Sequence, residues 1–116
     1  MDKTELLTSI KAMTAEERVK TAYTTMDEEI LTILSEDKRW FVREAVASNL
    51  NASPKTLESL AEDKQMFVRE AVAKNPNTDA KTLYKLATTK GNGIWVRIEV
   101  ARNSNTDIKT VSYTHL

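Results

Sequence analysis

The sequence predicts an all-α fold, an α-solenoid of about three 26-residue, two-helix repeats behind an N-terminal helical cap. One segment occurs three times, at residues 42–49, 68–75 and 96–103, so the copies start 26 and then 28 residues apart. A period in this range is typical of stacked helical repeats. The 116 residues include only two glycines and two prolines, which is few for a fold rich in tight turns and argues against a β-sheet protein.

The first 26 residues do not follow this repeat and are interpreted as the N-terminal cap of the array. A first short helix is predicted by apolar side chains at helical spacing, namely Leu6, Leu7, Ile10 and Met13. Thr14 and Glu17 are spaced as a capping box, which predicts the start of a second helix. An array of this kind needs a more polar end unit, because an apolar end would continue to stack.

Residues 27–110 form the predicted repeat array, in which each unit has two halves. One half is the Val-Arg-x-x-Val-Ala segment, and the other is a helix with the pattern Leu-x-x-Leu. Short polar residues recur where each leucine helix should begin and are expected to cap it: Asp27, Ser53, Asp79 and Asp107. Asparagines recur between the halves, as in Asn49 and Asn51, and predict a turn whose side chains satisfy backbone groups. The third unit has two additional residues near Gly91.

Residues 111–116 depart from the repeat. Thr114 and His115 stand where the preceding unit has Leu86 and Ala87. We therefore expect this segment to be a truncated or non-native tail, and we expect the natural protein to continue with further repeats.

Composition narrows the possible functions. Lys+Arg and Asp+Glu are equal at 17, and the imbalance within the chain, about −3 over residues 1–35 and about +3 over residues 36–116, is too small to indicate nucleic acid by itself. Without cysteine there is no disulfide, thiolate metal site or thiol nucleophile. The N-terminus has no signal-peptide pattern, and no stretch approaches the roughly 20 apolar residues of a membrane span. We expect a soluble, cytoplasmic protein without cofactors.

Read together, Val-Arg-Glu-Ala-Val-Ala-x-Asn-Pro-Asn-Thr and Lys-Thr-Leu-x-x-Leu-Ala resemble the bacterial leucine-rich repeat variant family, a compact relative of HEAT and armadillo repeats. The resemblance covers about residues 27–110. It implies a right-handed superhelix of alternating helices that serves as an interaction module. Some family members carry an iron–sulfur cluster on N-terminal cysteines, and this cofactor does not carry over to a chain without cysteine.

Three arginines, Arg43, Arg69 and Arg97, occupy one position of the repeat, so stacking would align them. Asp37 and Asp63 precede the first two by six residues, and guanidinium groups form bidentate contacts with carboxylates. The arginines are interpreted either as ties between neighbouring units or as a binding site for an anionic partner. Arg97 has a glycine six residues before it, and is therefore expected to be the freest to bind.

Large apolar residues also share positions of the repeat. One column contains Phe41, Phe67 and Trp95, and Trp40 belongs to the column just before it. Such rings either form the core between units or remain exposed to stack on bases or to grip a peptide. Trp40 is the harder to bury if Phe41 points inward, because adjacent helical positions diverge by roughly 100°.

A second basic column, Lys55, Lys81 and Lys109, lies near the start of the leucine helices. Positive charge at this end opposes the helix dipole, so its recurrence indicates either a basic stripe, joined by Lys74 and Arg102, or a solvated face.

Nothing in the sequence predicts catalysis, because the single histidine, His115, lies in the tail and no nucleophile is spaced with a base and an orienting group. We expect a monomeric, non-catalytic scaffold whose concave face binds an acidic protein or peptide. The residues predicted to contact the partner are Trp40, Arg43, Lys55, Arg69, Lys81, Trp95, Arg97 and Arg102. The alternatives are a nucleic-acid-binding module like the HEAT-like DNA glycosylases, and a structural fragment of a larger repeat protein.

Overall fold

The computed structural model describes residues 2–107, and this part of the chain contains eight helices and no strand. The helices are α1 (Lys3–Ala12), α2 (Ala15–Thr24), α3 (Glu28–Leu34), α4 (Trp40–Ala47), α5 (Pro54–Leu60), α6 (Met66–Lys74), α7 (Ala80–Thr88) and α8 (Ile94–Arg102). The prediction of an all-helical protein is confirmed. The predicted tail at 111–116 and the third lysine of the basic column, Lys109, lie outside the described residues.

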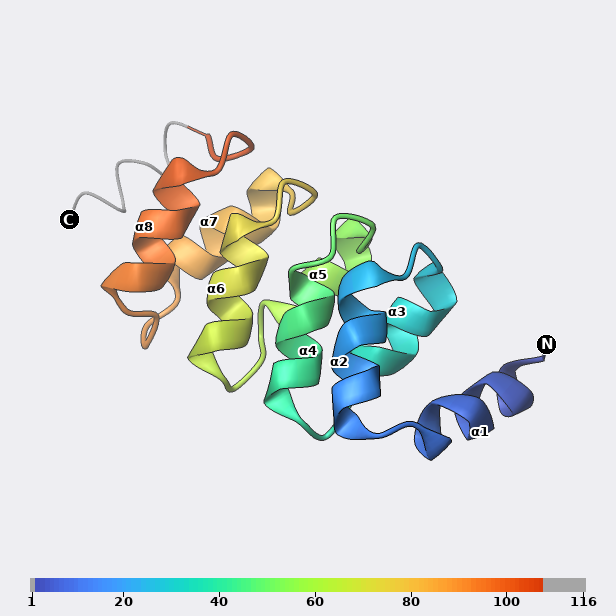
Figure 1. Cartoon of the computed structure of the whole chain (residues 1–116). Helices are drawn as coiled ribbons and strands as arrows, with labels where there is room; N and C mark the ends of the chain where they lie inside the picture. Colours follow the sequence, from blue (N-terminus) through green and yellow to red (C-terminus); the bar gives the residue numbers. More distant parts are fainter. Residues whose placement is uncertain (1, 108–116) are drawn as a thin grey trace.

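The even-numbered helices form one row and most odd-numbered helices lie behind it. Helix α2 packs against α4, α4 against α6, and α6 against α8, while α3, α5 and α7 connect successive members of the row (Figure 1). The molecule is elongated, with extents of 47 × 20 × 18 Å. Helix α1 projects from the N-terminal end of the row (Figure 1).

The core follows the two apolar patterns of the sequence. Valines four residues apart in α4, α6 and α8 and leucines three residues apart in α3, α5 and α7 share one helix face, which points inward. These buried side chains are Val42, Val46, Val68, Val72, Val96 and Val100, with Leu31, Leu34, Leu57, Leu60, Leu83 and Leu86. Burying each of them contributes about 1.5–3 kcal/mol, so this double stripe is the main source of stability.

Capping residues predicted from the sequence begin four of the eight helices, α2, α3, α5 and α7. The side chains of Asp27, Ser53 and Asp79 accept hydrogen bonds from the first turns of α3, α5 and α7, as expected. The capping box of Thr14 and Glu17 is also present, and its hydrogen bonds from Thr14 lower the pKa of the Glu17 carboxyl. By contrast, α4, α6 and α8 begin without a side-chain cap.

Asparagines fasten each unit to the one before it. Asn75 accepts from the backbone N–H of Asn77 at 2.8 Å, which is the predicted turn contact. Its Nδ2 also donates to the carbonyls of Ala47 and Asn49 in the preceding unit, at 2.8 and 2.9 Å. Equivalent bonds link Asn49 to Ala22 and Thr25, and Asn103 to Ala73 and Asn75. The turn chemistry was predicted, whereas this ladder between units was not.

Candidate interaction surface

Arg43 joins two neighbouring units. Its Nε donates to Asp63 Oδ2 at 2.6 Å and its Nη2 donates to Asp63 Oδ1 at 3.2 Å, while Nη1 donates to the carbonyl of Asp37 at 2.7 Å. The carboxylate therefore comes from the following unit, and the aspartate six residues before the arginine supplies a backbone carbonyl. Only 12% of the Arg43 side chain and 8% of the Asp63 side chain are exposed. This geometry supports the interpretation of Arg43 as a tie between units.

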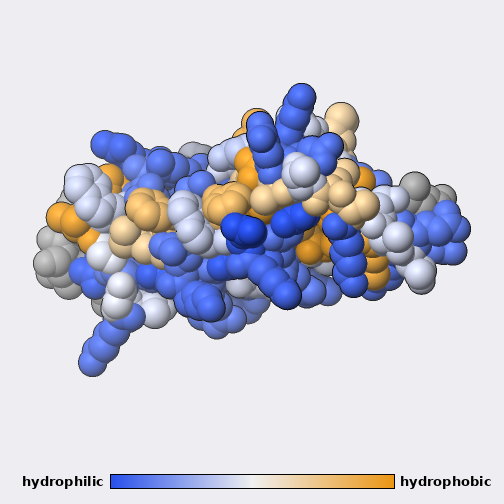
Figure 2. Space-filling model, turned by 60° about the horizontal axis from the view of Figure 1, so that its bottom comes forward, coloured by the Kyte–Doolittle hydropathy of each residue, from blue (hydrophilic) through white to orange (hydrophobic). Residues whose placement is uncertain are grey.

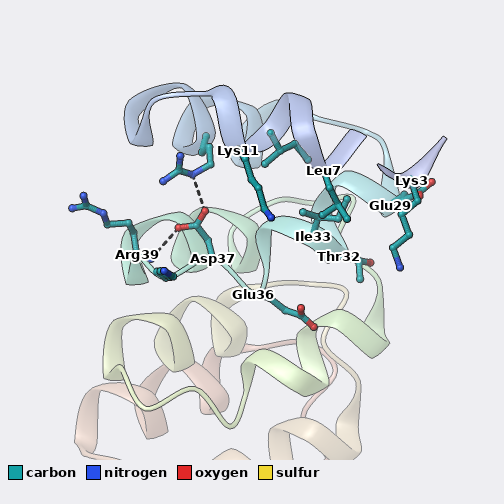
Figure 3. A pocket seen from close by; sticks show the side chains of 12 residues that line it. Lys3, Leu7, Lys11, Glu29, Thr32, Ile33, Glu36, Asp37 and Arg39 are labelled. Atoms are coloured by element: carbon teal, nitrogen blue, oxygen red, sulfur yellow. Dashed lines mark hydrogen bonds and ion pairs between the residues drawn. The ribbon is translucent and has the colours of Figure 1, made fainter. Parts of the chain in front are cut away.

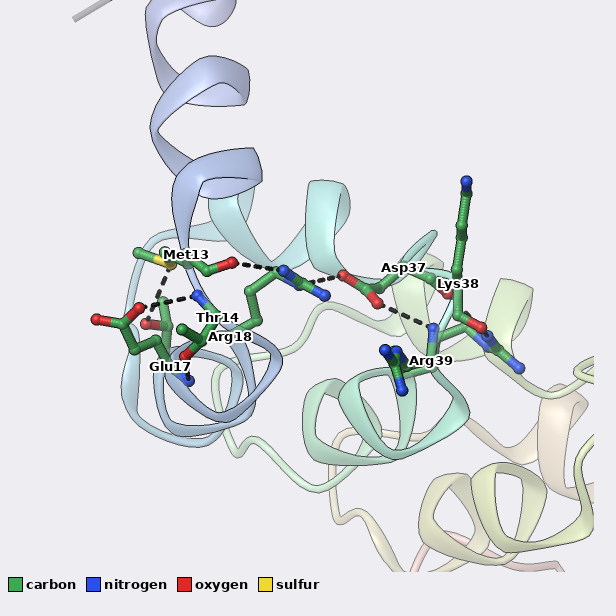
Figure 4. Close-up of polar contacts among 9 residues, drawn as sticks. Met13, Thr14, Glu17, Arg18, Asp37, Lys38 and Arg39 are labelled. Atoms are coloured by element: carbon green, nitrogen blue, oxygen red, sulfur yellow. Dashed lines mark hydrogen bonds and ion pairs between the residues drawn. The ribbon is translucent and has the colours of Figure 1, made fainter.

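Arg18 makes the same pair of contacts one unit earlier. Its Nε donates to Asp37 Oδ2 at 2.7 Å and its Nη1 donates to the carbonyl of Met13 at 2.7 Å (Figure 4). The second oxygen of Asp37 accepts from the backbone N–H of Arg39, which fixes the turn before α4. Helix α2, which lies in the segment interpreted as a cap, thus meets α4 through the contacts that later units use.

Arg69 continues this arginine ladder with a different acceptor. Its Nη1 donates to the carbonyl of Asp63 at 2.6 Å, in the usual manner. Its Nε, however, donates to the side-chain amide oxygen of Asn92 at 2.6 Å, where the preceding units have an aspartate. Arg69 is therefore also a tie between units, but its acceptor carries no charge.

Arg97 is the last arginine of the ladder in the described part of the chain. Its Nε is buried and has no hydrogen-bond acceptor among residues 2–107. Arg18, Arg43 and Arg69 find their side-chain acceptors 19, 20 and 23 residues later in the sequence, and for Arg97 this interval ends beyond the described residues. Gly91, six residues earlier, therefore does not explain why Nε of Arg97 lacks an acceptor, because in the other units this position supplies only a backbone carbonyl.

The first residues of α4, α6 and α8 expose large apolar side chains. Exposed fractions are 38% for Trp40, 46% for Phe67, 66% for Ile94 and 62% for Trp95. Trp40 stacks on Phe67 across the two helices, with ring centroids 5.5 Å apart and planes at 28°. We call these four residues the aromatic edge. They start the helices at the lower side of the row in Figure 1, and Figure 2 shows a broken band of hydrophobic groups along this side.

Lysines accompany the aromatic edge. Lys38, Lys64 and Lys90 are exposed and lie in the turns before α4, α6 and α8. Their spacing of 26 residues equals the repeat period, so the sequence contained a signal for this column that the prediction missed. Arg39 adds a further cation and stands 5.9 Å from the centroid of the Phe41 ring. The edge thus combines exposed rings with positive charge.

The predicted basic column lies at the opposite end of the helices. Lys55 and Lys81 are exposed second residues of α5 and α7, which follow the C-terminal turns of α4 and α6. Arg102 ends α8, 3.2 Å from Glu99. An eight- or nine-residue helix is about 12–14 Å long, so these side chains do not meet Trp40 and Trp95. The structure separates the predicted contact residues into three groups: Trp40 and Trp95 on the aromatic edge, the arginines of the ladder, and the basic residues at the opposite end.

A cavity of about 900 Å³ lies between α1 and α3. Leu7 on α1 and Ile33 on α3 line it, Lys11 reaches over it, and Glu36 lies at its far side (Figure 3). Sequence analysis did not predict this hollow, because it arises from the angle at which α1 leaves the row. Its lining combines apolar side chains with both acidic and basic ones, and this mixture does not indicate a particular class of ligand.

Acidic side chains are the remaining candidates for chemistry among residues 2–107. Within residues 2–107, no group of three histidine, cysteine, aspartate or glutamate side chains is arranged to hold a metal ion. Burial raises the pKa of the Glu44 carboxyl, and the nearby Glu70 adds to this rise, while Lys74 opposes it. In the same part of the chain, no helix is long and apolar enough to cross a membrane.

Fold and surface together define a class: an all-helical protein with an exposed edge of aromatic and basic side chains. No family model, no curated protein and no solved structure matches the chain.

Proposed function

We propose that this chain is a non-catalytic α-solenoid scaffold of about three repeats of the HEAT-like, leucine-rich repeat variant type behind an N-terminal cap. The support is the recurrence of one set of contacts along the row. Successive even-numbered helices pack against one another, and an asparagine after each of α4, α6 and α8 donates to carbonyls of the preceding unit. Such nearest-neighbour contacts are what a repeat fold requires.

In this proposal the scaffold binds an acidic peptide or protein segment along the aromatic edge, and this edge is the observation that carries it. Four of the eight exposed large hydrophobic residues of the described chain are the first or second residues of α4, α6 and α8. Exposed apolar groups gathered on one face are typical of interaction sites, and tryptophan is enriched among the residues that dominate binding energy. The partner lies along one rim of the row rather than across a concave face.

Charge favours an acidic partner. Lys38, Arg39, Lys64 and Lys90 flank the rings, whereas the carboxylates of Asp37 and Asp63 in the same turns are occupied by the arginine ladder. Complementary charge steers association and selects the partner more than it adds affinity. Apolar anchors on the partner would pack against the exposed side chains of Trp95 and Ile94. A single chain would suffice for this function.

Selection from a library of random 12-residue peptides on the immobilised full chain tests the proposal. We expect enrichment of sequences that combine Asp or Glu with Phe, Leu or Trp, and we expect Phe67→Ser and Trp95→Ser to weaken the selected peptides about tenfold or more in fluorescence anisotropy. Leu50→Ser is the matched control, because Leu50 is 66% exposed but lies in the turn after α4. Equal losses for all three variants would contradict the proposed surface.

A second candidate function is binding of single-stranded nucleic acid. The stack of Trp40 on Phe67, with Lys38 and Lys64 beside it, resembles the pairing of aromatic platforms with cations on which bases stack. Anisotropy with short duplex and single-stranded DNA at low and moderate salt distinguishes this function, since phosphate contacts make affinity fall steeply with salt. Failure to bind at low salt, in a folded sample, would remove it.

A further inference from the structure

Arg69 differs from Arg43 in the charge that it faces. Both oxygens of the Asp63 carboxylate accept from Arg43. Arg69 instead donates to the neutral amide of Asn92 and to a backbone carbonyl, and among residues 2–107 its Nη2 has no acceptor and no carboxylate lies within ion-pair distance. A partly buried cation with only neutral acceptors retains an electrostatic preference for an anion.

A cavity of about 330 Å³ opens beside Arg69, between the α5–α6 turn and the α7–α8 loop. Its charged lining residues are Glu62, Asp63, Lys64, Arg69, Lys85 and Lys90. Glu62 pairs with Lys85 at 2.6 Å, and Asp63 pairs with Arg43. Three cations of the lining, Lys64, Arg69 and Lys90, are therefore left without a carboxylate partner in the described part of the chain.

The α7–α8 loop holds this arrangement in place. It contains the two additional residues of the third unit, and Gly91 turns the chain there with a φ of +96°, which favours glycine. Asn92 is 6% exposed, and its Nδ2 donates to the carbonyl of Leu86 at 2.8 Å. This bond directs the amide oxygen, rather than the nitrogen, toward Arg69. The neutral acceptor is therefore built into the loop.

We propose that this cavity binds a phosphate group carried by the partner, which makes the proposed function that of a phosphopeptide-binding scaffold. The inference rests on the proposed function for the identity of the partner. A phosphate monoester carries about −1.5 to −2 charges near neutral pH and several strong acceptor oxygens. Three unpaired cations match such a group better than they match a single carboxylate, and guanidinium forms charge-assisted bonds with phosphate oxygens.

The neighbouring cavity argues for one phosphate rather than a polyanion. A hollow of about 490 Å³ between α3 and α5 shares Asp63 with the proposed site. Its other charged lining residues are Glu28, Glu36 and Lys55. A nucleic-acid backbone that ran from the proposed site toward the N-terminal end of the chain would meet these carboxylates in the preceding unit. A peptide with one phosphorylated serine or threonine would not.

Nuclear magnetic resonance titration of the full chain with inorganic phosphate and with O-phosphoserine tests the site. We expect saturable shifts of the amides of Lys64, Lys90 and Asn92, and Lys90→Glu should weaken binding about tenfold, as for loss of one charged hydrogen bond. Lys38→Glu is the matched control, because Lys38 holds the same repeat position in an earlier turn. Equal weakening by both variants, or shifts spread over all exposed lysines, would overturn the proposal.

A second variant supplies the missing carboxylate. Asn92→Asp places an anion beside Arg69, as Asp63 stands beside Arg43, and should abolish phosphate shifts while the helical circular dichroism is retained. Unchanged phosphate binding by a folded Asn92→Asp variant would contradict the site. If the variant does not fold, because Leu86 loses its donor, the comparison of Lys90→Glu with Lys38→Glu decides.

Peptides from the library selection separate the two proposals. A serine-phosphorylated form should bind more tightly than its unmodified parent, and Trp95→Ser should weaken the peptide but leave inorganic phosphate binding unchanged. If peptides bind at the aromatic edge and phosphorylation has no effect, the phosphate site is wrong and the scaffold function stands. If phosphate shifts appear but no peptide is selected, the scaffold function fails instead. Tighter binding of an oligo-dT strand than of the phosphopeptide would overturn the phosphopeptide assignment.

Discussion

Asparagines join neighbouring units through buried hydrogen bonds. Each of these asparagine side chains makes hydrogen bonds both within its own turn and to the unit before. In Asn75, the oxygen accepts from a backbone N–H of the turn and the nitrogen donates to two carbonyls of the preceding unit. Asn75 is 3% exposed, so solvent does not compete for these bonds in the folded protein. Leaving a buried acceptor unsatisfied costs about 1–3 kcal/mol.

Replacement of Asn75 by alanine should therefore lower the free energy of unfolding by about 2–4 kcal/mol, because two carbonyls lose their donor and the turn loses its acceptor. Equilibrium urea denaturation followed by circular dichroism measures this loss. Asn51→Ala provides the control and should remain within about 0.5 kcal/mol of the wild type, since Asn51 is exposed. A small effect at Asn75 would show that water can substitute for the ladder.

Elements were predicted well where a local rule decides them. The leucine helices start at the capping residues that the sequence indicated, and Asn75 and Asn103 end α6 and α8 as turn chemistry requires. Which unit supplies the carboxylate to Arg43 could not be predicted, because sequence spacing alone does not distinguish the aspartate six residues before from the one 20 residues after. The exposure of the aromatic edge could not be predicted either, since residues at one repeat position can lie in the core or in solvent. Phe41 is half-buried, whereas Phe67 is exposed.

The cap of α7 makes a pH-dependent contribution. The hydrogen bond from the backbone N–H of Thr82, with a smaller effect of Lys81, lowers the pKa of the Asp79 carboxyl below its ordinary value of 3.8. The ionised form therefore favours the folded state. This contribution is present above pH 3.8 and is lost as pH falls through the lower pKa of the folded protein.

Asp79→Ala should destabilise the protein by about 1 kcal/mol near neutral pH, and this difference should shrink in acid. Thermal unfolding at about pH 7 and about pH 2.5 measures both values. Asp79→Ser keeps a capping oxygen that does not titrate, so the Ser and Ala variants should differ by the same amount at both pH values. A difference between wild type and Asp79→Ala that persisted in acid would contradict the role of the charge.

At the scale of the whole molecule, stability is unevenly distributed along the row. Helix α4 buries four hydrophobic side chains between its neighbours α2 and α6. Helix α1 buries only Ile10, with Leu6 packed against the core, and stands beside a cavity. Local opening energies follow such differences in buried contact.

Hydrogen exchange should therefore reveal a gradient. Amides of α1 should exchange at least about a hundredfold faster than those of α4 and α6, because α1 can detach without opening the row. Mass spectrometry of the exchanging full chain measures this ratio. Uniform protection from α1 to α6 would instead indicate that the cavity between α1 and α3 closes in solution.

The hydrogen bonds that join the units come from residues outside the aromatic edge, and within the edge only the stack of Trp40 on Phe67 is described as spanning two units. Asn49, Asn75 and Asn103 bond mainly to backbone carbonyls, which every amino acid provides. The first two residues of α4, α6 and α8 make no such hydrogen bonds through their side chains, and they already differ: Trp-Phe, Met-Phe and Ile-Trp. Substitutions at these positions could therefore change the binding preference while the asparagine hydrogen bonds between units were kept. The binding preference can change in this way because the hydrogen bonds between units come from asparagines outside the aromatic edge.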